Sequence, residues 1–516
     1  MKTNPAQDCR DSNVVASPSG KSIPRLPYFF LAVLLVVVAI FRSPILFDDR
    51  TWYDEEAVIL QGHGISTVAW PSPFRRADVY LDPTFSAVLA AVRTGAYPPA
   101  MPATVFLFRG TTEPVRYLRS FLFTLGLALL VVAFLTAKSA GGAWFALLAT
   151  TYVASSTVLT HASQQIKWIS IAPPVSLIAA MLLLKPSASN RIRLTYVLAL
   201  GVLLHIHYFC LWVVPGHLLY TLMLDRDHLS RQLKEIALAL AAAAPWYLFA
   251  LPTQLEFVRE HFDDVAQMEV SAWNAPLSFM TGVRGLGYDL ATGAGLLPLP
   301  LRGRYLTPLL LIVIWCLARA VTSQVPGRKR LGILAVTCAG SAAAAQVLYA
   351  VKVGNLVPLQ PTYLSPWFPL LMIGILAGAS EIGVRGIRVI VMCTLVAISL
   401  TAVAHAPLAD KIAESGAPQD NEGLCRAVSA LVRADLALVH QTDLEAKLFN
   451  IGCPIGVWQA VGIPGMERLP ATARHALVVG GCELPFRALP DGWQLRNSNC
   501  EENTILAAWR HRSGGP

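Results

Sequence analysis

Long apolar runs separated by short polar segments follow one another along most of this chain. A helix needs ~20 consecutive, mostly apolar residues to cross the hydrocarbon core of a bilayer. Runs near that length predict membrane-spanning helices at 28–46, 115–137, 144–160, 168–184, 236–251, 305–320, 331–351, 363–379 and 387–404, and a longer run occupies 194–224. The pattern therefore predicts an all-α polytopic membrane protein.

The run 194–224 is too long for one comfortable span, and the charges beside it decide how it crosses. Basic residues precede it at Lys185, Arg191 and Arg193 and follow it at Arg226, Arg231 and Lys234. Because basic loops stay on the cytoplasmic side, the run is expected to cross out and back as two short helices hinged at 205–208. The sum is about eleven spans with the N-terminus inside and the C-terminus outside.

This topology divides the chain into three parts. Residues 1–26 form a cytoplasmic tail, 27–405 a membrane module, and 406–516 an extracytoplasmic domain. The module carries two large outer loops, 47–114 and 252–304, and the first is expected to hold surface-lying helices, with 74–94 as one candidate. Apolar clusters at 476–479 and 505–508 between Gly and Pro turns predict a small α/β domain in the tail.

Composition agrees with a membrane protein. Of 516 residues, 54% are hydrophobic and 14% are charged, whereas a soluble domain carries roughly 25% charged residues. The net charge of +9 comes without a dense basic patch that interleaves aromatic residues, which argues against a nucleic-acid partner. No phosphate-binding loop or dinucleotide-binding glycine pattern is present, which argues against a pump driven by ATP and a nucleotide-sugar enzyme.

Cysteine positions fit the same topology. The tail holds Cys425, Cys453, Cys482 and Cys500, an even set that permits two disulfides in an oxidising compartment. Cys210, Cys316, Cys338 and Cys393 lie in apolar spans and are expected to be plain core residues.

The candidate chemistry begins directly after the first span. Five carboxylates fall within residues 48–56, namely Asp48, Asp49, Asp54, Glu55 and Glu56. Carboxylates beside a bilayer are costly unless they face water or do chemistry. The segment is therefore either a solvated loop or the acidic part of an active site.

Several short motifs, in order, resemble one family. They are Asp54-Glu55, Tyr97-Pro98-Pro99, the Arg-Tyr-Leu-Arg-Ser segment at 116–120, the Ser-Gln-Gln-Ile-Lys-Trp segment at 163–168, His207-Tyr208, and the Gln-Pro-Thr-Tyr-Leu-Ser-Pro segment at 360–366. In this set and order the chain resembles the GT-C membrane glycosyltransferases, and among them the branch of protein O-mannosyltransferases and lipid A aminoarabinose transferases. The resemblance covers the membrane module and leaves the tail uncovered.

The resemblance implies a sugar donor linked to a polyprenyl phosphate and an inverting transfer on the extracytoplasmic face. Asp54 matches the family's acidic position, with Glu55 as its partner and Asp48 and Asp49 in reserve. A carboxylate is the natural general base for the acceptor hydroxyl. The leaving group is a phosphate, whose developing charge calls for cations or a metal; Asp54 and Glu55 can offer oxygen ligands to Mg²⁺ or Mn²⁺.

Two lysines are the candidates for the donor phosphate. Lys167 and Lys352 are each predicted at the outer end of a span. The family often carries Arg before the residue that matches Tyr363, but this chain has Thr362 there, which makes Lys352, or Arg302 and Arg304, the substitute. The alternative is that these basic side chains only anchor the helices to lipid headgroups.

The hinge and one loop supply the remaining candidates. His205, His207 and Tyr208 can bind a metal, contact sugar hydroxyls, or form a tight polar turn with hydrogen-bonded imidazoles. Tyr97 is expected to shape the wall of the first loop, where the two following prolines stop a helix.

The leading hypothesis is thus a multi-pass glycosyltransferase of the inner (plasma) membrane. Its acceptor would be an envelope glycan such as lipopolysaccharide, a lipid, or a protein. The alternatives are a transporter or flippase of lipid-linked sugars, and a non-catalytic assembly protein with the same fold. Clustering of charge in outer loops, rather than at the midplane of broken helices, favours the enzyme over the transporter.

Overall fold

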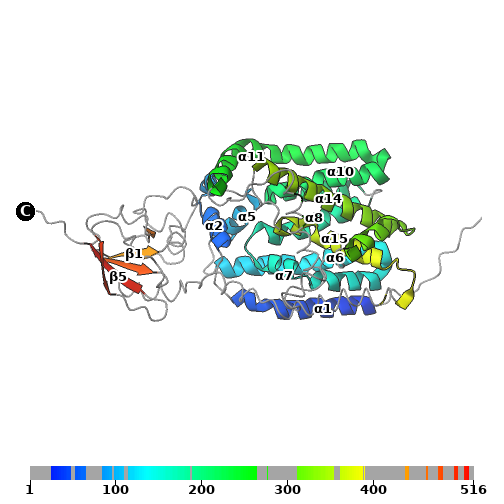
Figure 1. The fold of residues 1–516 in the computed structure, drawn as a ribbon, viewed down its shortest axis with the longest axis horizontal. Coiled ribbons are helices and arrows are strands. Elements are labelled where there is room, and N and C mark those ends of the chain that lie inside the picture. Colours follow the sequence, from blue (N-terminus) through cyan, green and yellow to red (C-terminus); the bar gives the residue numbers. More distant parts are fainter. Residues whose placement is uncertain are drawn as a thin grey trace, which may run out of the picture.

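The computed structural model describes a helical body and a small sheet. The described residues are 25–47, 53–64, 84–95, 98–109, 114–185, 189–263, 311–353 and 361–386, the single helical positions 276, 280 and 389, and five strands of the tail. Apart from position 389, the predicted span 387–404 falls outside them, as do Cys393 and the four tail cysteines. Figure 1 shows the helices running side by side and the sheet beyond the end of the body at which α2 lies.

Helices follow one another in the order that the apolar runs predict. The first half holds α1 (Leu26–Arg42), η1 (Ser43–Phe47), α2 (Tyr53–Gly62), α4 (Phe85–Arg93), α5 (Ala100–Leu107), α6 (Pro114–Ala154), α7 (Thr157–Gln164) and α8 (Trp168–Leu183). The second half holds α9 (Asn190–Ile206), η2 (Tyr208–Trp212), α10 (Val213–Leu224), η3 (Arg226–His228), α11 (Leu229–Asp263), the helix Leu311–Val321, α14 (Pro326–Val353), η5 (Pro361–Trp367) and α15 (Phe368–Ala379).

Several helices have the length and composition of membrane spans. Within the described residues, three pass on length and hydropathy, Val115–Ala154, Arg226–Glu256 and Pro326–Lys352, and the bent pair α7 and α8 makes a fourth if it is one span. Shorter apolar helices include Leu26–Arg42, Tyr208–Leu224, Leu311–Val321 and Tyr363–Ala379. The membrane location is therefore supported by the helices themselves.

The outward faces of these helices are apolar. On α1, Phe29, Val36 and Phe41 are more than half exposed, and Leu198 of α9 and Leu248 of α11 are likewise exposed. Contiguous exposed apolar surface of this extent is rare on soluble proteins and marks a surface that meets another apolar phase. The hydrocarbon of a bilayer is the phase that fits helices of this composition.

Two breaks in the helices come from identifiable residues. α6 is kinked at Gly142, whose φ of 80° lies in the left-handed region that favours glycine, and the predicted span 115–137 lies before this kink. The predicted span 144–160 is wrong at its end, because α6 ends at Ala154 and residues 157–160 belong to α7. Between α9 and η2, His207 is extended with φ −160° and ψ 146°. The predicted hinge at 205–208 is confirmed.

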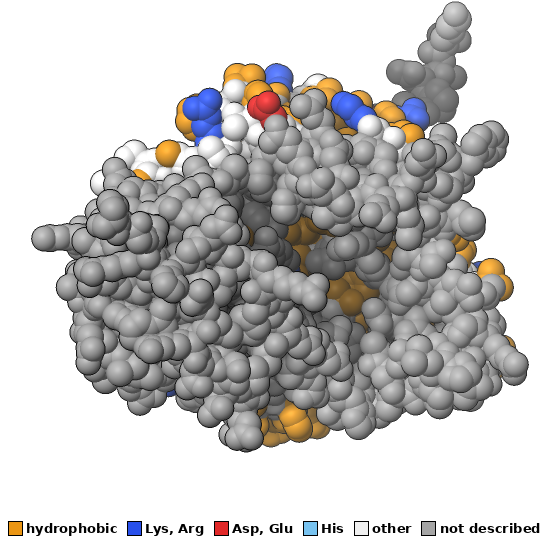
Figure 2. Space-filling model, turned by 60° about the vertical axis from the view of Figure 1, so that its left-hand side comes forward, with side chains coloured by type: hydrophobic (Ala, Val, Ile, Leu, Met, Phe, Trp, Pro, Cys, Tyr) orange, Lys and Arg blue, Asp and Glu red, His pale blue; other side chains and the backbone are white. Residues whose placement is uncertain are grey.

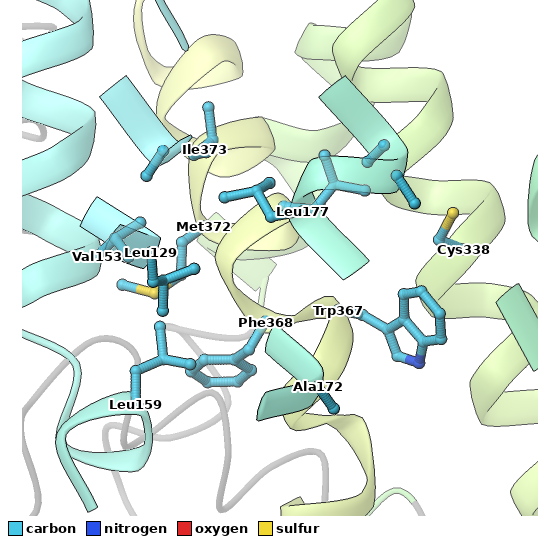
Figure 3. Close-up of a cluster of buried hydrophobic side chains, with 14 of the residues drawn as sticks. Leu129, Val153, Leu159, Ala172, Leu177, Cys338, Trp367, Phe368, Met372 and Ile373 are labelled. Atoms are coloured by element: carbon cyan, nitrogen blue, oxygen red, sulfur yellow. The ribbon is translucent and has the colours of Figure 1, made fainter. Parts of the chain in front are cut away.

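The core is built where α15 packs among α6, α8 and α14 (Figure 3). Trp367 and Phe368 are 2% and 1% exposed and lie close to Ala172 of α8 and Leu159 of α7 respectively. Gly378 permits the closest approach, since a Cβ there would meet the backbone of Cys316. Cys210, Cys316 and Cys338 are buried free thiols, as expected for core residues.

The first loop does contain short helices. α4 lies within the predicted segment 74–94 and buries Val88 and Val92 against Trp246 and Ala250 of α11. Thr84 caps α4 by accepting a hydrogen bond from Ala87 N at 3.2 Å. α11 extends to Asp263, beyond the predicted span end at 251, so Pro252 does not end the helix.

The tail contains a five-stranded mixed sheet. Its strands are β1 (Leu436–His440), β2 (Val461–Gly462), β3 (His475–Val479), β4 (Trp493–Asn497) and β5 (Ile505–Arg510), in the order β2-β1-β3-β5-β4. β1 pairs in parallel with β2 and β3, whereas β3–β5 and β4–β5 are antiparallel. The two apolar clusters seen in the tail are thus neighbouring strands; the α/β class of the domain stays a prediction.

Candidate active site

The acidic segment is anchored to the bundle by Glu55. This residue lies in the first turn of α2, and its side chain is 1% exposed. One carboxylate oxygen, Oε1, accepts a hydrogen bond from the backbone N–H of Ile166 at 2.7 Å. The other, Oε2, lies 3.3 Å from Nη2 of Arg119 in α6, whose side chain is also 1% exposed. Removing one partner of such a buried ion pair costs about 3–5 kcal/mol, because the other charge stays buried.

The backbone segment that is hydrogen-bonded to Glu55 is a sharp break between α7 and α8. α7 ends at Gln164, Gln165 is extended, and Lys167 is extended with φ −138° and ψ 164° before α8 begins. The two helices are bent by 115° relative to one another. The break leaves the N–H of Ile166 outside helical hydrogen bonding, so that a side chain has to satisfy it. The predicted motif 163–168 is therefore the docking point of the acidic helix.

A second buried charge ties α1 to the same region. Arg42, 4% exposed, ends α1. Its Nη2 donates to the carbonyl oxygen of Ala154 at 2.6 Å and to Oγ1 of Thr160 at 2.8 Å, and its Nη1 donates to Oγ of Ser163 at 3.3 Å. Sequence analysis missed Arg42, although a lone cation within an apolar run is itself a signal.

Aromatic rings line the neighbouring side of the break. Trp168, the first residue of α8, stacks on His207 with ring centroids 4.0 Å apart and planes 22° from parallel. Tyr363 of η5 stacks on Trp168 at 5.8 Å and 14° and approaches Phe209 at 4.6 Å. Three segments that are far apart in sequence thus meet beside Lys167 in one aromatic cluster, defined here as Trp168, His207, Phe209 and Tyr363.

Both hinge histidines are hydrogen-bonded. Nδ1 of His207 accepts from the backbone N–H of Phe209 at 3.2 Å, which leaves the proton of the neutral ring on Nε2. Nδ1 of His205 lies 2.9 Å from the carbonyl oxygen of Gly201 in its own helix. The reading as a tight polar turn is the one that these contacts support.

The remaining predicted binding residues are separated in space. Tyr208 donates its hydroxyl hydrogen to Oε1 of Gln254 in α11, and Gln254 donates to the carbonyl oxygen of Val92 at 2.7 Å, so Tyr208 faces α11 and α4. Lys167 is half-buried next to the aromatic cluster, whereas Lys352 is exposed in the last turn of α14. His207 and Tyr363 come together on Trp168, the residue that follows Lys167, whereas no described contact joins His205 or Lys352 to them, and Tyr208 faces α11.

Six predicted residues carry no described side chain. Asp48, Asp49, Tyr97, Arg302 and Arg304 lie outside the described residues, and Asp54 is described only as backbone in α2. The two oxygens of Glu55 face a guanidinium and a backbone N–H, and a role of Asp54 and Glu55 as Mg²⁺ or Mn²⁺ ligands stays a prediction. Within the part of the chain that the structure describes, no three His, Cys, Asp or Glu residues group as a metal site.

Figure 2 turns forward the end of the body beyond which the sheet lies, and shows described hydrophobic side chains in the middle of this face. Lys and Arg side chains are visible along the upper edge of the same view.

Comparisons with known proteins return structures and no sequence relatives. No protein-family model matches the chain, and no curated protein matches it. Two solved structures of ArnT from Cupriavidus metallidurans, in the apo state and bound to undecaprenyl phosphate, are 15% and 14% identical to this chain, with TM-scores of 0.49 and 0.48. The alignments cover 95% and 96% of this chain and 99% and 100% of theirs.

A third similar structure comes from an archaeon. It is the oligosaccharyltransferase AglB from Archaeoglobus fulgidus in complex with an inhibitory peptide and a dolichol-phosphate, at 11% identity and a TM-score of 0.42, covering 88% of this chain and 70% of that one.

Proposed function

We propose that this protein is a GT-C membrane glycosyltransferase that moves a sugar from a polyprenyl-phosphate carrier to an acceptor on the extracytoplasmic face. The observation that carries the proposal is the buried contact of Glu55 with Arg119 and Ile166. It holds the helix of the acidic segment against the break that contains Lys167. A membrane protein bears the cost of such a buried charge where a precise position is needed.

The topology proposed for this reaction has eleven crossings with the N-terminus inside. They are α1, the two arms of α6, α8, α9, η2 with α10, α11, the helix Leu311–Val321, α14, η5 with α15, and the predicted span 387–404. Support comes from the charges: the starts of α9, α11 and α14 carry Arg193, Arg231 and Arg328, and the break at Lys167 lies at the opposite helix ends. The sheet and α2 lie at that opposite end (Figure 1).

The proposed chemistry is a single displacement. Asp54 takes the proton of the acceptor hydroxyl while the hydroxyl oxygen bonds to the anomeric carbon. The bond from that carbon to the phosphate oxygen breaks, and its electrons leave with the phosphate, so the anomeric centre inverts. Lys167 stabilises the phosphate charge. Glu55 acts as a positioning residue, because its two oxygens hold the acidic helix in place.

The aromatic cluster serves the donor in this proposal. Tyr363 is the half-buried ring that would meet the donor, and aromatic surfaces bind both the apolar carbons of a polyprenyl chain and the C–H face of a sugar. Trp168, only 5% exposed, and His207 pack against Tyr363 and against each other and support it. The acceptor (a glycan, a lipid or a protein) and the identity of the sugar are left open by this arrangement.

The test is the Asp54→Asn variant, purified and reconstituted with a radiolabelled polyprenyl-phosphate sugar and envelope-derived acceptors. Loss of a general base typically lowers the rate by about 10²–10⁴-fold. The matched control is Glu256→Gln, an exposed carboxylate on α11, which should leave transfer unchanged. Transfer by Asp54→Asn at the wild-type rate would defeat the assignment, and movement of the lipid-linked sugar across vesicles without covalent transfer would favour the flippase.

A further inference from the structure

A polar cavity lies at the basic end of the helical body, at the helix ends opposite to the break at Lys167. It has a volume of about 50 Å³ and is enclosed by the end of α8, the start of α9, the end of α10 and the start of α11. One water molecule needs ~10–15 Å³ on the same measure. The cavity therefore has room for a polar group of several heavy atoms, such as a phosphate.

Cations outnumber carboxylates around this cavity. Lys185, Arg193 and Arg231 contribute to its lining. Of its two carboxylates, Glu235 is paired with Arg193 and lies 3.9 Å from Nε of Arg231, and Asp225 accepts a hydrogen bond at 2.9 Å from Arg330, a further cation outside the lining. Lys185 takes part in none of the ion pairs found among the described residues. The balance of charge in the cavity favours an anion.

The polar floor of the cavity is fixed by hydrogen bonds. Nε2 of Gln232 donates to the hydroxyl oxygen of Tyr196 at 2.7 Å, and that hydroxyl lies 2.8 Å from Nδ1 of His217. All three side chains are at most 5% exposed. A floor held in this way presents hydrogen-bonding groups in fixed positions without reorganisation on binding.

One wall of the cavity is apolar. Leu182, Leu183 and Ile192 line it alongside the cations. A site for a free, fully hydrated phosphate does not need aliphatic side chains, whereas the glycerol and first acyl carbons of a phospholipid do. Basic pockets between transmembrane helices on the cytoplasmic side are a known setting for anionic lipid headgroups.

We propose that this cavity binds the headgroup phosphate of an anionic phospholipid in the leaflet at the basic end of the body. Lys185 and Arg231 contact the phosphate, and the wall of Leu182, Leu183 and Ile192 contacts the adjoining apolar part of the lipid. The bound lipid joins α8, α9, α10 and α11 at the end remote from the acidic segment. This site does not depend on the transfer reaction.

The experiment titrates the full-length protein in detergent with phosphatidylglycerol or phosphatidylcholine and counts bound lipids by native mass spectrometry. The wild type should prefer phosphatidylglycerol. The double variant Lys185→Gln/Arg231→Gln should lose this preference, with apparent affinity falling about fivefold for each cation removed. The matched control is Arg191→Gln/Lys234→Gln, which removes two exposed cations of the same helices that do not line the cavity.

Each outcome of this experiment either supports or overturns the proposed lipid site. Unchanged phosphatidylglycerol binding by Lys185→Gln/Arg231→Gln overturns the site, and an equal loss in the control shows only a diffuse attraction to a basic surface. Displacement by millimolar inorganic phosphate as effective as displacement by added lipid overturns the lipid assignment. If the double variant does not fold, as judged by thermal unfolding, Lys185→Glu alone gives the same readout, because that side chain is exposed.

Discussion

The two ends of the helical body hold charge in different ways. At the end that bears α2, Glu55 and Arg119 are each 1% exposed and Arg42 is 4% exposed. At the basic end, the pair Arg328–Glu381 is 22% and 17% exposed. Water and headgroups therefore share the solvation of the second pair, whereas protein atoms alone surround the first.

This difference in burial distinguishes charges that hold a site in position from charges that lie at the surface of the bundle. Moving a charge out of water costs several kcal/mol per ion even after relaxation, so a fully buried pair gains little net stability from its own attraction. A partly exposed pair avoids most of that cost and contributes about 0–1 kcal/mol. Buried charge at the α2 end therefore indicates a need for position, which supports the proposed site there.

The largest expected effect comes from breaking the buried pair. Arg119→Ala removes the guanidinium that faces the buried Glu55 carboxylate, which should destabilise the protein by about 3–5 kcal/mol. Thermal unfolding in detergent measures this loss. Arg116→Ala, an exposed arginine one turn earlier in α6, is the control. Equal melting temperatures for the two variants would remove the argument that Glu55 is positioned by a buried partner.

A smaller effect is expected from Arg42, which makes charge-assisted hydrogen bonds and no described ion pair. Arg42→Gln keeps part of the hydrogen bonding to Ala154, Thr160 and Ser163 but removes the charge. A hydrogen bond to a charged group contributes about 1.5–3 kcal/mol, so we expect a loss in that range. Chemical denaturation monitored by Trp fluorescence checks it, with Arg25→Gln, exposed before α1, as the control. If Arg42→Gln lowers the free energy of unfolding by less than the control does, the charge of Arg42 does not stabilise the protein.

The smallest effect on stability is expected at the basic end of the body, from a change to Arg328. Burial raises the pKa of Glu381, but hydrogen bonds from Arg328 and Ser323 and the charges of Arg328 and Arg319 outweigh it, so the pKa lies below its ordinary value. A lowered pKa means stability that is present above the ordinary carboxyl pKa and lost as pH falls through the folded value. Arg328→Gln should remove this acid sensitivity at a cost under about 1 kcal/mol at neutral pH.

Melting temperature measured between neutral and acidic pH checks that prediction. Lys329→Gln, an exposed neighbour, should keep the wild-type acid dependence. An Arg328→Gln loss as large as that of Arg119→Ala would erase the distinction between the two ends of the molecule.

Much of the helical order was readable from the apolar runs, because each membrane span has to be apolar over a fixed length. The basic residues around 194–224 predicted the hinge that His207 makes. The turn at Gly142 falls between two predicted spans. The pattern failed at α11, where the helix continues through Pro252. Gln254 in this extension is buried and bonded to Tyr208 and to the carbonyl oxygen of Val92, contacts between distant segments that no local pattern contains.

The candidate site was predicted only in part. The acidic segment, Lys167, His207 and Tyr363 were identified by residue type and by resemblance, and the structure brings His207 and Tyr363 together beside Trp168, the neighbour of Lys167 in the chain. Glu55 was expected beside the reacting groups as a carboxylate; its buried contacts with Arg119 and Ile166 indicate an anchor. No local pattern could pair Glu55 with Arg119, because the two lie far apart in the chain.

The sequence by itself determined that this protein is built of apolar helices, where most of them begin and end, and which side of the bundle is basic, since bilayer thickness and the cost of charge act on each segment separately. Only the tertiary structure decided which charges are buried and what holds them. Pairing across helices depends on packing geometry, which no single segment contains.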